Sequence, residues 1–195
     1  MADNFSLAHK FTAMWEDGLS GHPVESGSVT NHGVSLKYLQ GVAAESQSNR
    51  DILERMGIRL PVTRSVIIDL SKSQASGLFR WQFWDRLKLD RIPLRPAVVI
   101  YDAAVNHGLP LSVVFAQRGY NRCVTYGQPL DVDGLLGFAT RRAMRETDTD
   151  KALMAMLDQR EAFFQSIVDK DRNQEVFLHG WLNRLDALGR YVRGL

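Results

Sequence analysis

Two carboxylates nine residues apart, Glu16 and Glu25, have the residue type and spacing best suited to catalysis in this chain. Glu16 lies at the end of an amphipathic segment, Glu25 lies in a stretch rich in Gly, Ser and Pro, and Thr30 and Asn31 follow. An acid on a rigid element that faces a second polar group across a cleft can cleave a glycosidic bond. The pattern predicts Glu16 as the proton donor. Glu25 and Thr30 would position water or stabilise positive charge on the sugar.

The same residues also have structural interpretations. Glu16 can be a surface residue at a helix end, and Glu25 and Thr30 can solvate a loop or cap a turn. Asn31 can hydrogen-bond to loop backbone. A proton donor needs partly apolar surroundings to retain its proton near neutral pH. The sequence neighbours that could supply them are Met14, Trp15 and Leu19.

Composition predicts one compact domain spanning residues 1–195. The chain is 45% hydrophobic and 24% charged, which is ordinary for a globular protein and sufficient for a sizeable core. Its net charge of +2 and pI near 8.8 are only mildly basic. No dense run of Lys and Arg supports a nucleic-acid partner, whereas an anionic cell-wall polymer would suit this charge.

The sequence motifs do not indicate a metal-binding or cofactor-binding site. The five histidines have no metal-ligand spacing such as HExxH, which argues against a zinc peptidase. Cys123 is the only cysteine, so the chain cannot form an internal disulfide. Its thiol can be an inert buried group or a nucleophile beside a histidine. Glycine-rich phosphate-binding motifs and GxSxG are absent from the sequence, and we expect no metal or cofactor.

The N-terminal sequence lacks the basic and apolar regions of a signal peptide. The longest uncharged run, Ala103 to Gln117, contains Asn106, His107, Gly108 and Pro110, which do not suit a transmembrane span. We therefore expect synthesis in the cytoplasm and no membrane insertion.

Apolar residues at three- and four-residue spacing predict a mainly helical fold. A first helix over Phe5–Trp15 is followed by a loop or hairpin over Pro23–Gly33. The segment Val62–Leu70 fits strand or helix, and Ala97–Val105 is predicted to be a buried central helix. Other helices are expected from Val34–Leu39 onward, over Ser48–Met56, from Ser73 onward, and over Pro110–Tyr120, Leu135–Glu146, Asp148–Val168 and Glu175–Val192, with a polar loop over Asn121–Asp133. The core candidates, one or two of which could line a sugar cleft, are Trp81, Phe83, Trp84 and Trp181.

The N-terminal half resembles glycoside hydrolase family 108, the lysozyme-like N-acetylmuramidases of phage endolysins and secretion-associated muramidases. The matching positions are Glu16-Asp17-Gly18-Leu19 and Gly27-Ser28-Val29-Thr30-Asn31-His32-Gly33-Val34. The resemblance implies an α+β, lysozyme-like helical bundle around the central helix, with a small hairpin region after the first helix. It also implies Glu16 as proton donor, Glu25 and Thr30 as its catalytic partners, and Asn31 and His32 as substrate contacts. Asp17, Leu19, Glu25 and Ser28 depart from the family pattern.

The second half resembles the peptidoglycan-binding region that accompanies this family. The matching segments are Phe83–Pro93, Tyr101–Gly108, Asp133–Thr140 and His179–Leu185. We therefore expect a catalytic-motif lobe over residues 1–90 and a peptidoglycan-binding lobe over residues 91–195. Asp102 and Asn106 would help to shape the cleft, or they have structural roles.

The resemblance implies a monomeric peptidoglycan hydrolase that cleaves the β-1,4 bond between N-acetylmuramic acid and N-acetylglucosamine in glycan strands. It would reach the cell wall after holin- or secretion-dependent release and there cause bacteriolysis. Two alternatives stay open. The chain can be a non-catalytic peptidoglycan-binding protein on the same fold, or a peptidase that acts on the stem peptides of the wall.

Overall fold

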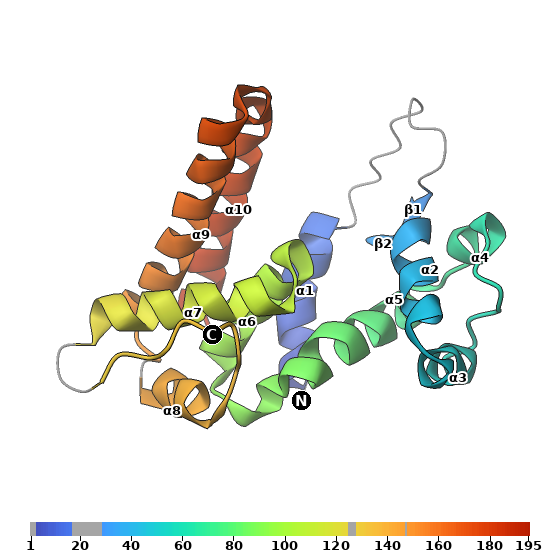
Figure 1. Cartoon of the computed structure of the whole chain (residues 1–195), viewed down its shortest axis with the longest axis horizontal. Coiled ribbons are helices and arrows are strands. Elements are labelled where there is room, and N and C mark those ends of the chain that lie inside the picture. Colours follow the sequence, from blue (N-terminus) through green and yellow to red (C-terminus); the bar gives the residue numbers. More distant parts are fainter. Residues whose placement is uncertain (1–2, 17–28, 125–127, 147) are drawn as a thin grey trace. The chain divides into compact units, whose positions relative to one another are not determined.

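The computed structural model describes residues 3–16, 29–124, 128–146 and 148–195. This part of the chain is mainly helical and contains one two-stranded sheet (Figure 1). The mainly α fold class, with a small hairpin after the first helix, is thereby confirmed. The chain forms two compact units: unit 1 comprises Met1–Phe11 with Phe83–Leu195, and unit 2 comprises Thr12–Gln82. The division into lobes 1–90 and 91–195 stays a prediction.

Unit 2 contains the end of the first helix and the elements that follow it. Helix α1, Asn4–Glu16, begins in unit 1 and ends in unit 2. The later elements are β1 Thr30–Asn31, β2 Val34–Ser35, α2 Leu36–Glu45, α3 Gln47–Arg55, α4 Arg64–Ile68 and α5 Lys72–Phe79. The ambiguous segment Val62–Leu70 is therefore helical at its centre.

Serine residues define the starts of three of these helices. The hydroxyl of Ser35 accepts a hydrogen bond from Tyr38 N at the start of α2, and Ser46 does the same for Asn49 N at the start of α3. Ser71 begins α5 with a capping box. Because Val34 and Ser35 belong to β2, the helix expected from Val34 begins at Leu36.

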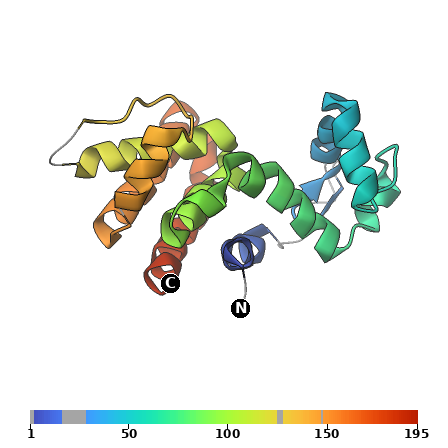
Figure 2. The same ribbon diagram turned by 90° about the horizontal axis from the view of Figure 1, so that it is seen from below.

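The core of unit 2 is formed by apolar side chains from its short helices. Leu39 of α2, Leu53 of α3 and Ile67 of α4 have no exposed surface, and Leu78 of α5 is almost fully buried. Helices α2 and α3 lie side by side in both ribbon views (Figures 1 and 2). Burial of these side chains is the main favourable term that holds such short helices together.

Unit 1 is built from longer helices. Its elements after α1 are the π-helical segment η1 Arg80–Asp85, which begins in unit 2, η2 Leu89–Arg91, α6 Leu94–His107, α7 Leu109–Cys123, α8 Phe138–Glu146, α9 Asp150–Lys170, η3 Arg172–Gln174 and α10 Glu175–Arg193. The helices predicted over Pro110–Tyr120 and Asp148–Val168 correspond to α7 and α9, and α7 extends into the expected polar loop.

Helix α6 is the buried central helix that the sequence predicted. Every residue from Pro96 to Ala104 is buried, and α7, α9 and α10 pack against this helix. Gly108 ends it with a φ of 83°, a conformation that favours glycine, and Pro110 lies in the first turn of α7. Of the aromatic core candidates, Trp84 is fully buried, whereas Trp81, Phe83 and Trp181 are half-buried.

Close packing between α7 and α9 requires a residue without a side chain. A Cβ atom on Gly119 of α7 would lie 2.7 Å from the backbone of Met156 in α9. Helices α9 and α10 form an antiparallel pair (Figure 1).

Among the described residues, no helix combines the length and the apolar character that crossing a membrane requires.

Candidate active site

Glu16, the predicted proton donor, is the last residue of α1 and is half-buried. It lies directly beside the turn between β1 and β2. A Cβ atom built on Gly33 in that turn would come within 3.0 Å of the Glu16 Cβ and within 3.2 Å of the Phe79 Cζ. The sequence neighbours Met14 and Trp15 are exposed, and Leu19 lies outside the described residues. The apolar side chain described next to this turn is therefore that of Phe79 of α5.

The hairpin next to Glu16 has a two-residue turn. Asn31 pairs with Val34 and Thr30 pairs with Ser35 in the antiparallel register. His32 and Gly33 between them have φ values of 48° and 76°. Two central residues with positive φ are the requirement of a type I′ turn, which suits the twist of a hairpin. Histidine is one of the few residues other than glycine that are enriched in this region.

Thr30 and His32 lie on this hairpin. His32 directly precedes Gly33, the residue whose backbone lies against Glu16, and Thr30 is three residues before it. Thr30 is exposed at the start of β1, and His32 is half-buried. Their side chains are thus carried by the same short element that packs against the end of α1. Catalysis by Thr30 and substrate binding by His32 stay predictions.

Asn31 ties the hairpin to α4. Its side-chain amide donates hydrogen bonds to Ile67 O at 3.0 Å, Ile68 O at 3.1 Å and Leu70 O at 3.2 Å. These carbonyls lie at and just after the C-terminal end of α4, where the helix itself supplies no donors. The structural interpretation of Asn31 as a backbone-binding residue is therefore realised, but on a helix end rather than on its own loop. Its substrate-binding role stays a prediction.

Glu25, the second predicted carboxylate, lies outside the described residues, as do Asp17, Leu19 and Ser28. Its catalytic role stays a prediction.

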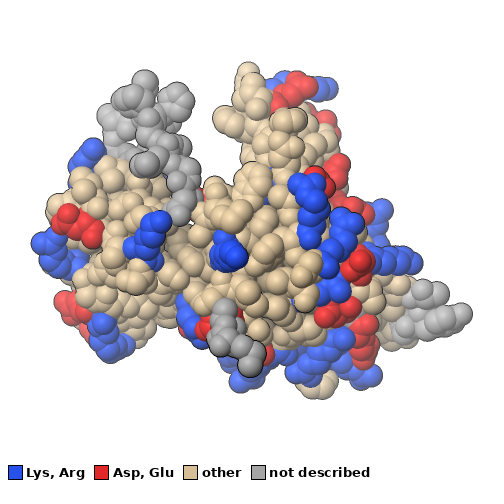
Figure 3. Space-filling model, turned by 180° about the vertical axis from the view of Figure 1, so that it is seen from behind, with Lys and Arg blue, Asp and Glu red and all other residues tan. Residues whose placement is uncertain are grey.

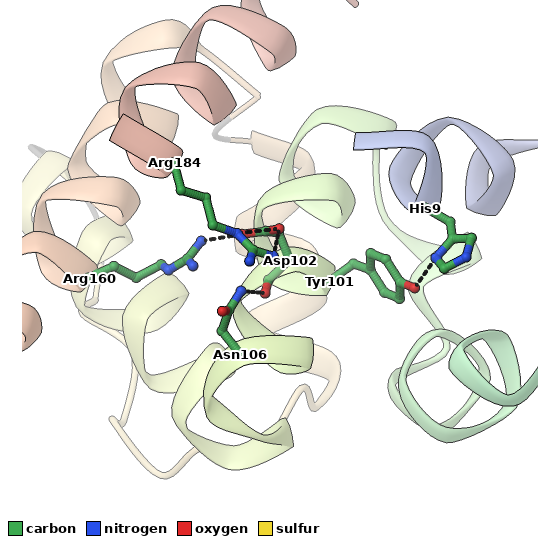
Figure 4. A network of polar contacts seen from close by, with 6 residues as sticks. All are labelled: His9, Tyr101, Asp102, Asn106, Arg160 and Arg184. Atoms are coloured by element: carbon green, nitrogen blue, oxygen red, sulfur yellow. Dashed lines mark hydrogen bonds and ion pairs between the residues drawn. The ribbon is translucent and has the colours of Figure 1, made fainter. Parts of the chain in front are cut away.

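Asp102 lies in the core of unit 1 and has no exposed surface. Its Oδ2 accepts a hydrogen bond from Arg160 Nη1 at 2.8 Å, and its Oδ1 accepts one from Arg184 Nη2 at 2.7 Å (Figure 4). Burial by itself raises the pKa of Asp102, but the charges of Arg184 and Arg160 outweigh burial and lower it. The geometry favours the structural alternative for this residue.

Asn106, one turn further along α6, is exposed and donates a hydrogen bond from Nδ2 to Asp102 O at 2.9 Å (Figure 4). On the same helix, Tyr101 extends toward α1, where its hydroxyl lies 2.9 Å from His9 Nδ1. Both contacts stabilise unit 1, and a role for Asn106 in substrate binding stays a prediction.

Sequence reasoning did not identify Phe79, Arg160 and Arg184 as partners of the candidate residues. A signal for the two arginines was present, because a carboxylate inside an apolar helix needs a buried cation. The sequence does not indicate which cations pair with Asp102, because Arg160 and Arg184 are 58 and 82 residues away from it in the chain. The apolar contact of Phe79 with the turn carried no such signal.

Cys123 is half-buried, and its thiol donates a hydrogen bond to Lys151 O at 3.8 Å. Within the part of the chain that is described, His, Cys, Asp and Glu side chains form no group of three or more that could hold a metal ion.

Comparisons with known proteins support the N-terminal and C-terminal resemblances separately. Residues 9–108 match the model of the family described as glycosyl hydrolase 108, and residues 112–186 match a family described as a predicted peptidoglycan domain. The first match ends at Gly108, between α6 and α7, and the second begins in the first turn of α7. No curated protein matches the chain.

Among solved structures, SagA from Brucella abortus has a similar fold. It is 21% identical in sequence and superimposes with a TM-score of 0.69, and the match covers 97% of this chain and 94% of SagA.

Proposed function

Because the chain belongs to the glycosyl hydrolase 108 family, we propose that it cleaves the β-1,4 bond between N-acetylmuramic acid and N-acetylglucosamine, with Glu16 as general acid. The chain is a glycoside hydrolase, and its two family matches support peptidoglycan as the substrate. The bond and the roles of individual residues are our proposal.

The observation that carries this proposal is the packing of the end of α1 against the hairpin. The family match includes both elements, and the Gly33 turn brings the hairpin into contact with Glu16. A general acid must be held in a fixed position next to the leaving oxygen, because small displacements reduce the rate steeply. A helix end that is in contact with a tight turn, which itself lies next to buried Phe79, meets this requirement.

In the proposed reaction, the Glu16 carboxyl group donates its proton to the glycosidic oxygen as the bond to the muramic acid breaks. Glu25 and Thr30 act on the opposite side of the sugar, where they position the attacking water or stabilise the positive charge of the oxocarbenium-like transition state. Asn31 holds the hairpin against α4 while this occurs. No step requires a metal ion or a cofactor.

The setting of the reaction belongs to the same proposal. The enzyme would act on the bacterial cell wall as a monomer, after holin- or secretion-dependent release. A phage endolysin that causes bacteriolysis and a secretion-associated muramidase both fit this setting.

The proposal is tested by digesting purified peptidoglycan with the wild type and with Glu16→Gln, and by analysing the products by mass spectrometry. We expect the wild type to release fragments with new reducing muramic acid ends. Glu16→Gln should be slower by at least about 100-fold, the typical contribution of a general acid. Glu54→Gln removes an exposed carboxylate from α3 of the same unit and should behave as the wild type.

Other product patterns would contradict the proposal. Equal activity of Glu16→Gln and the wild type would remove Glu16 from the mechanism. Released peptides without new reducing ends would indicate a peptidase, and binding without any cleavage would indicate a wall-binding protein.

A further inference from the structure

Three arginines from two distant segments gather on unit 1. Arg91 lies in η2, and Arg141 and Arg145 lie in α8. Residues four apart on a helix share a face, so Arg141 and Arg145 project from the same side of α8. Arg145 Nη2 donates a hydrogen bond to Arg91 O at 3.0 Å, which fixes this side of α8 against η2. We refer to Arg91, Arg141 and Arg145 as the arginine cluster.

The charges of the arginine cluster are not neutralised by the described residues. Arg141 is half-buried, and its Nε is inaccessible to solvent and has no hydrogen-bond partner among the described residues. Burial, together with the charges of Arg91 and Arg145, lowers the pKa of Arg141. No ion pair joins the cluster to any carboxylate within the described ranges.

Two other arginines of unit 1 differ in this respect. Arg142, the next residue on α8, pairs with Glu146 at 2.9 Å, and Arg190 of α10 pairs with Asp186. Both have an acidic partner four residues away on their own helix. The absence of such a partner therefore distinguishes the arginine cluster from these two residues.

We propose that the arginine cluster binds carboxylate groups on the stem peptides of peptidoglycan. This inference rests on the proposed function, because it assumes peptidoglycan as the substrate. Helix α8 lies within the segment that matches the predicted peptidoglycan domain, residues 112–186. The site would hold the wall polymer by its peptides, separately from the hairpin at which its glycan is cut.

The positions of the free carboxylates in peptidoglycan indicate that the ligand is the stem peptide. The N-acetylated sugars are neutral, and the lactyl carboxyl group of muramic acid is joined to the peptide as an amide wherever a stem is present. The free carboxylates of a substituted strand therefore lie on the stems. A guanidinium group matches a carboxylate with two parallel hydrogen bonds, which a neutral hydroxyl or amide cannot provide.

The surface around unit 1 carries many ionised side chains. On the face drawn in Figure 3, Lys and Arg side chains gather with Asp and Glu in the lower right part of the picture. A charge that already has a partner, such as Arg142 with Glu146 or Arg190 with Asp186, contributes little to binding. An unpaired cluster retains its attraction for an anion, and salt screens that attraction over about 10 Å at 0.1 M.

The test measures binding of the full chain to two soluble probes. The first probe is glycan strands that carry peptide stems, and the second is the same strands after the free carboxylates of their stems have been converted to neutral methyl amides. Glu16→Gln is introduced in every protein so that the strands stay intact. We expect binding to the first probe to be at least about tenfold tighter, and to weaken as salt is added.

The variant Arg141→Gln with Arg145→Gln should remove this preference. Arg142→Gln with Arg190→Gln is the matched control, because it removes the same formal charge from paired sites and should leave the preference intact. If the first double variant does not fold, the single variant Arg145→Gln, whose side chain is exposed, provides the same readout. A charge-preserving variant, Arg141→Lys with Arg145→Lys, should bind with intermediate strength because lysine lacks the planar fork.

Three results would overturn the inference. They are equal affinity for both probes, equal losses in the two double variants, and tighter binding to polyglycerol phosphate than to the peptide-bearing strands. Failure of the proposed function has a different signature. It would abolish cleavage of the first probe by proteins that retain Glu16, but it would leave unchanged the preference for strands with free stem carboxylates.

Discussion

The Cβ of Glu16 packs against the backbone of Gly33, so closely that a Cβ at position 33 would lie only 3.0 Å from it. The same added atom would lie 3.2 Å from the ring of Phe79. This contact connects the end of α1 to the turn that carries the predicted substrate residues. The position of the proposed acid is therefore set by the absence of a side chain on its neighbour.

Gly33→Ala is expected to lower the rate of peptidoglycan cleavage by about tenfold to 100-fold, since the added methyl group must displace Glu16 or the turn. The φ of 76° adds strain for any residue other than glycine. The rate constant on purified peptidoglycan and the melting temperature measure the two effects. Gly41→Ala in α2 is the control, because a Cβ there meets nothing within 4 Å. Unchanged cleavage by Gly33→Ala would show that the contact does not position the acid.

Asn31→Ala is expected to destabilise the protein by about 1–3 kcal/mol, because three carbonyls at the end of α4 lose the hydrogen bond from the Asn31 amide, and of these Ile67 O keeps one from Leu70 N. Urea unfolding measures this loss. If Asn31 has a structural role, the variant has a lower free energy of unfolding and an altered kcat, because the hairpin is less firmly held. If Asn31 binds substrate, the variant has a higher KM and unchanged stability. Unfolding and steady-state kinetics together therefore separate the two interpretations.

Asp102→Asn is expected to destabilise the protein by about 3–5 kcal/mol, because it leaves Arg160 and Arg184 buried without a counter-charge. Thermal and urea unfolding provide the measurement. Asp186→Asn, which breaks an exposed pair with Arg190, should cause no measurable change. A stable Asp102→Asn protein with impaired glycan binding would instead support a role for this residue in the cleft.

Acid is expected to destabilise the protein through His107. Burial, and then the charge of Arg160, lowers the pKa of His107 from 6.5 to about 4, and its ring contacts Phe115, Phe163 and Phe164. Between these pH values the unfolded chain takes up a proton that the folded chain does not. The free energy of unfolding must therefore fall as the pH drops from about 6.5 to about 4.

The measurement is the free energy of unfolding as a function of pH for the wild type and His107→Phe. The variant should show a shallower decline over this range, whatever its absolute stability. Parallel curves would contradict the assignment. The contribution of Asp102 occurs at lower pH, because its lowered pKa keeps it ionised until the pH falls below its usual value of 3.8.

Much of the helical architecture could be predicted from local patterns. The spacing of Phe5, Ala8 and Phe11 predicted α1, and the apolar run after Pro96 predicted the buried helix α6. Gly108 and Pro110 marked the boundary between α6 and α7 correctly. These signals are local, because capping, helix period and proline geometry act over a few residues.

Local patterns were insufficient where packing decides the conformation. The segment Val62–Leu70 fitted strand or helix equally, and its helical conformation is associated with contacts between α4 and β1. The helix predicted from Ser73 onward continues into the segment Arg80–Asp85, whose π-helical geometry was not predicted. Short apolar runs have no decisive period, so their partners determine their structure.

The sequence by itself determined the residue types that can do the chemistry, the mainly helical fold and the family to which the chain belongs. Only the tertiary structure decided which residues meet: the Gly33 turn with Glu16 and Phe79, Asn31 with the end of α4, and Asp102 with two arginines. The physical reason is range. Helix formation and turn chemistry depend on neighbours in the chain, whereas close packing and the pairing of buried charges depend on residues that only folding brings together.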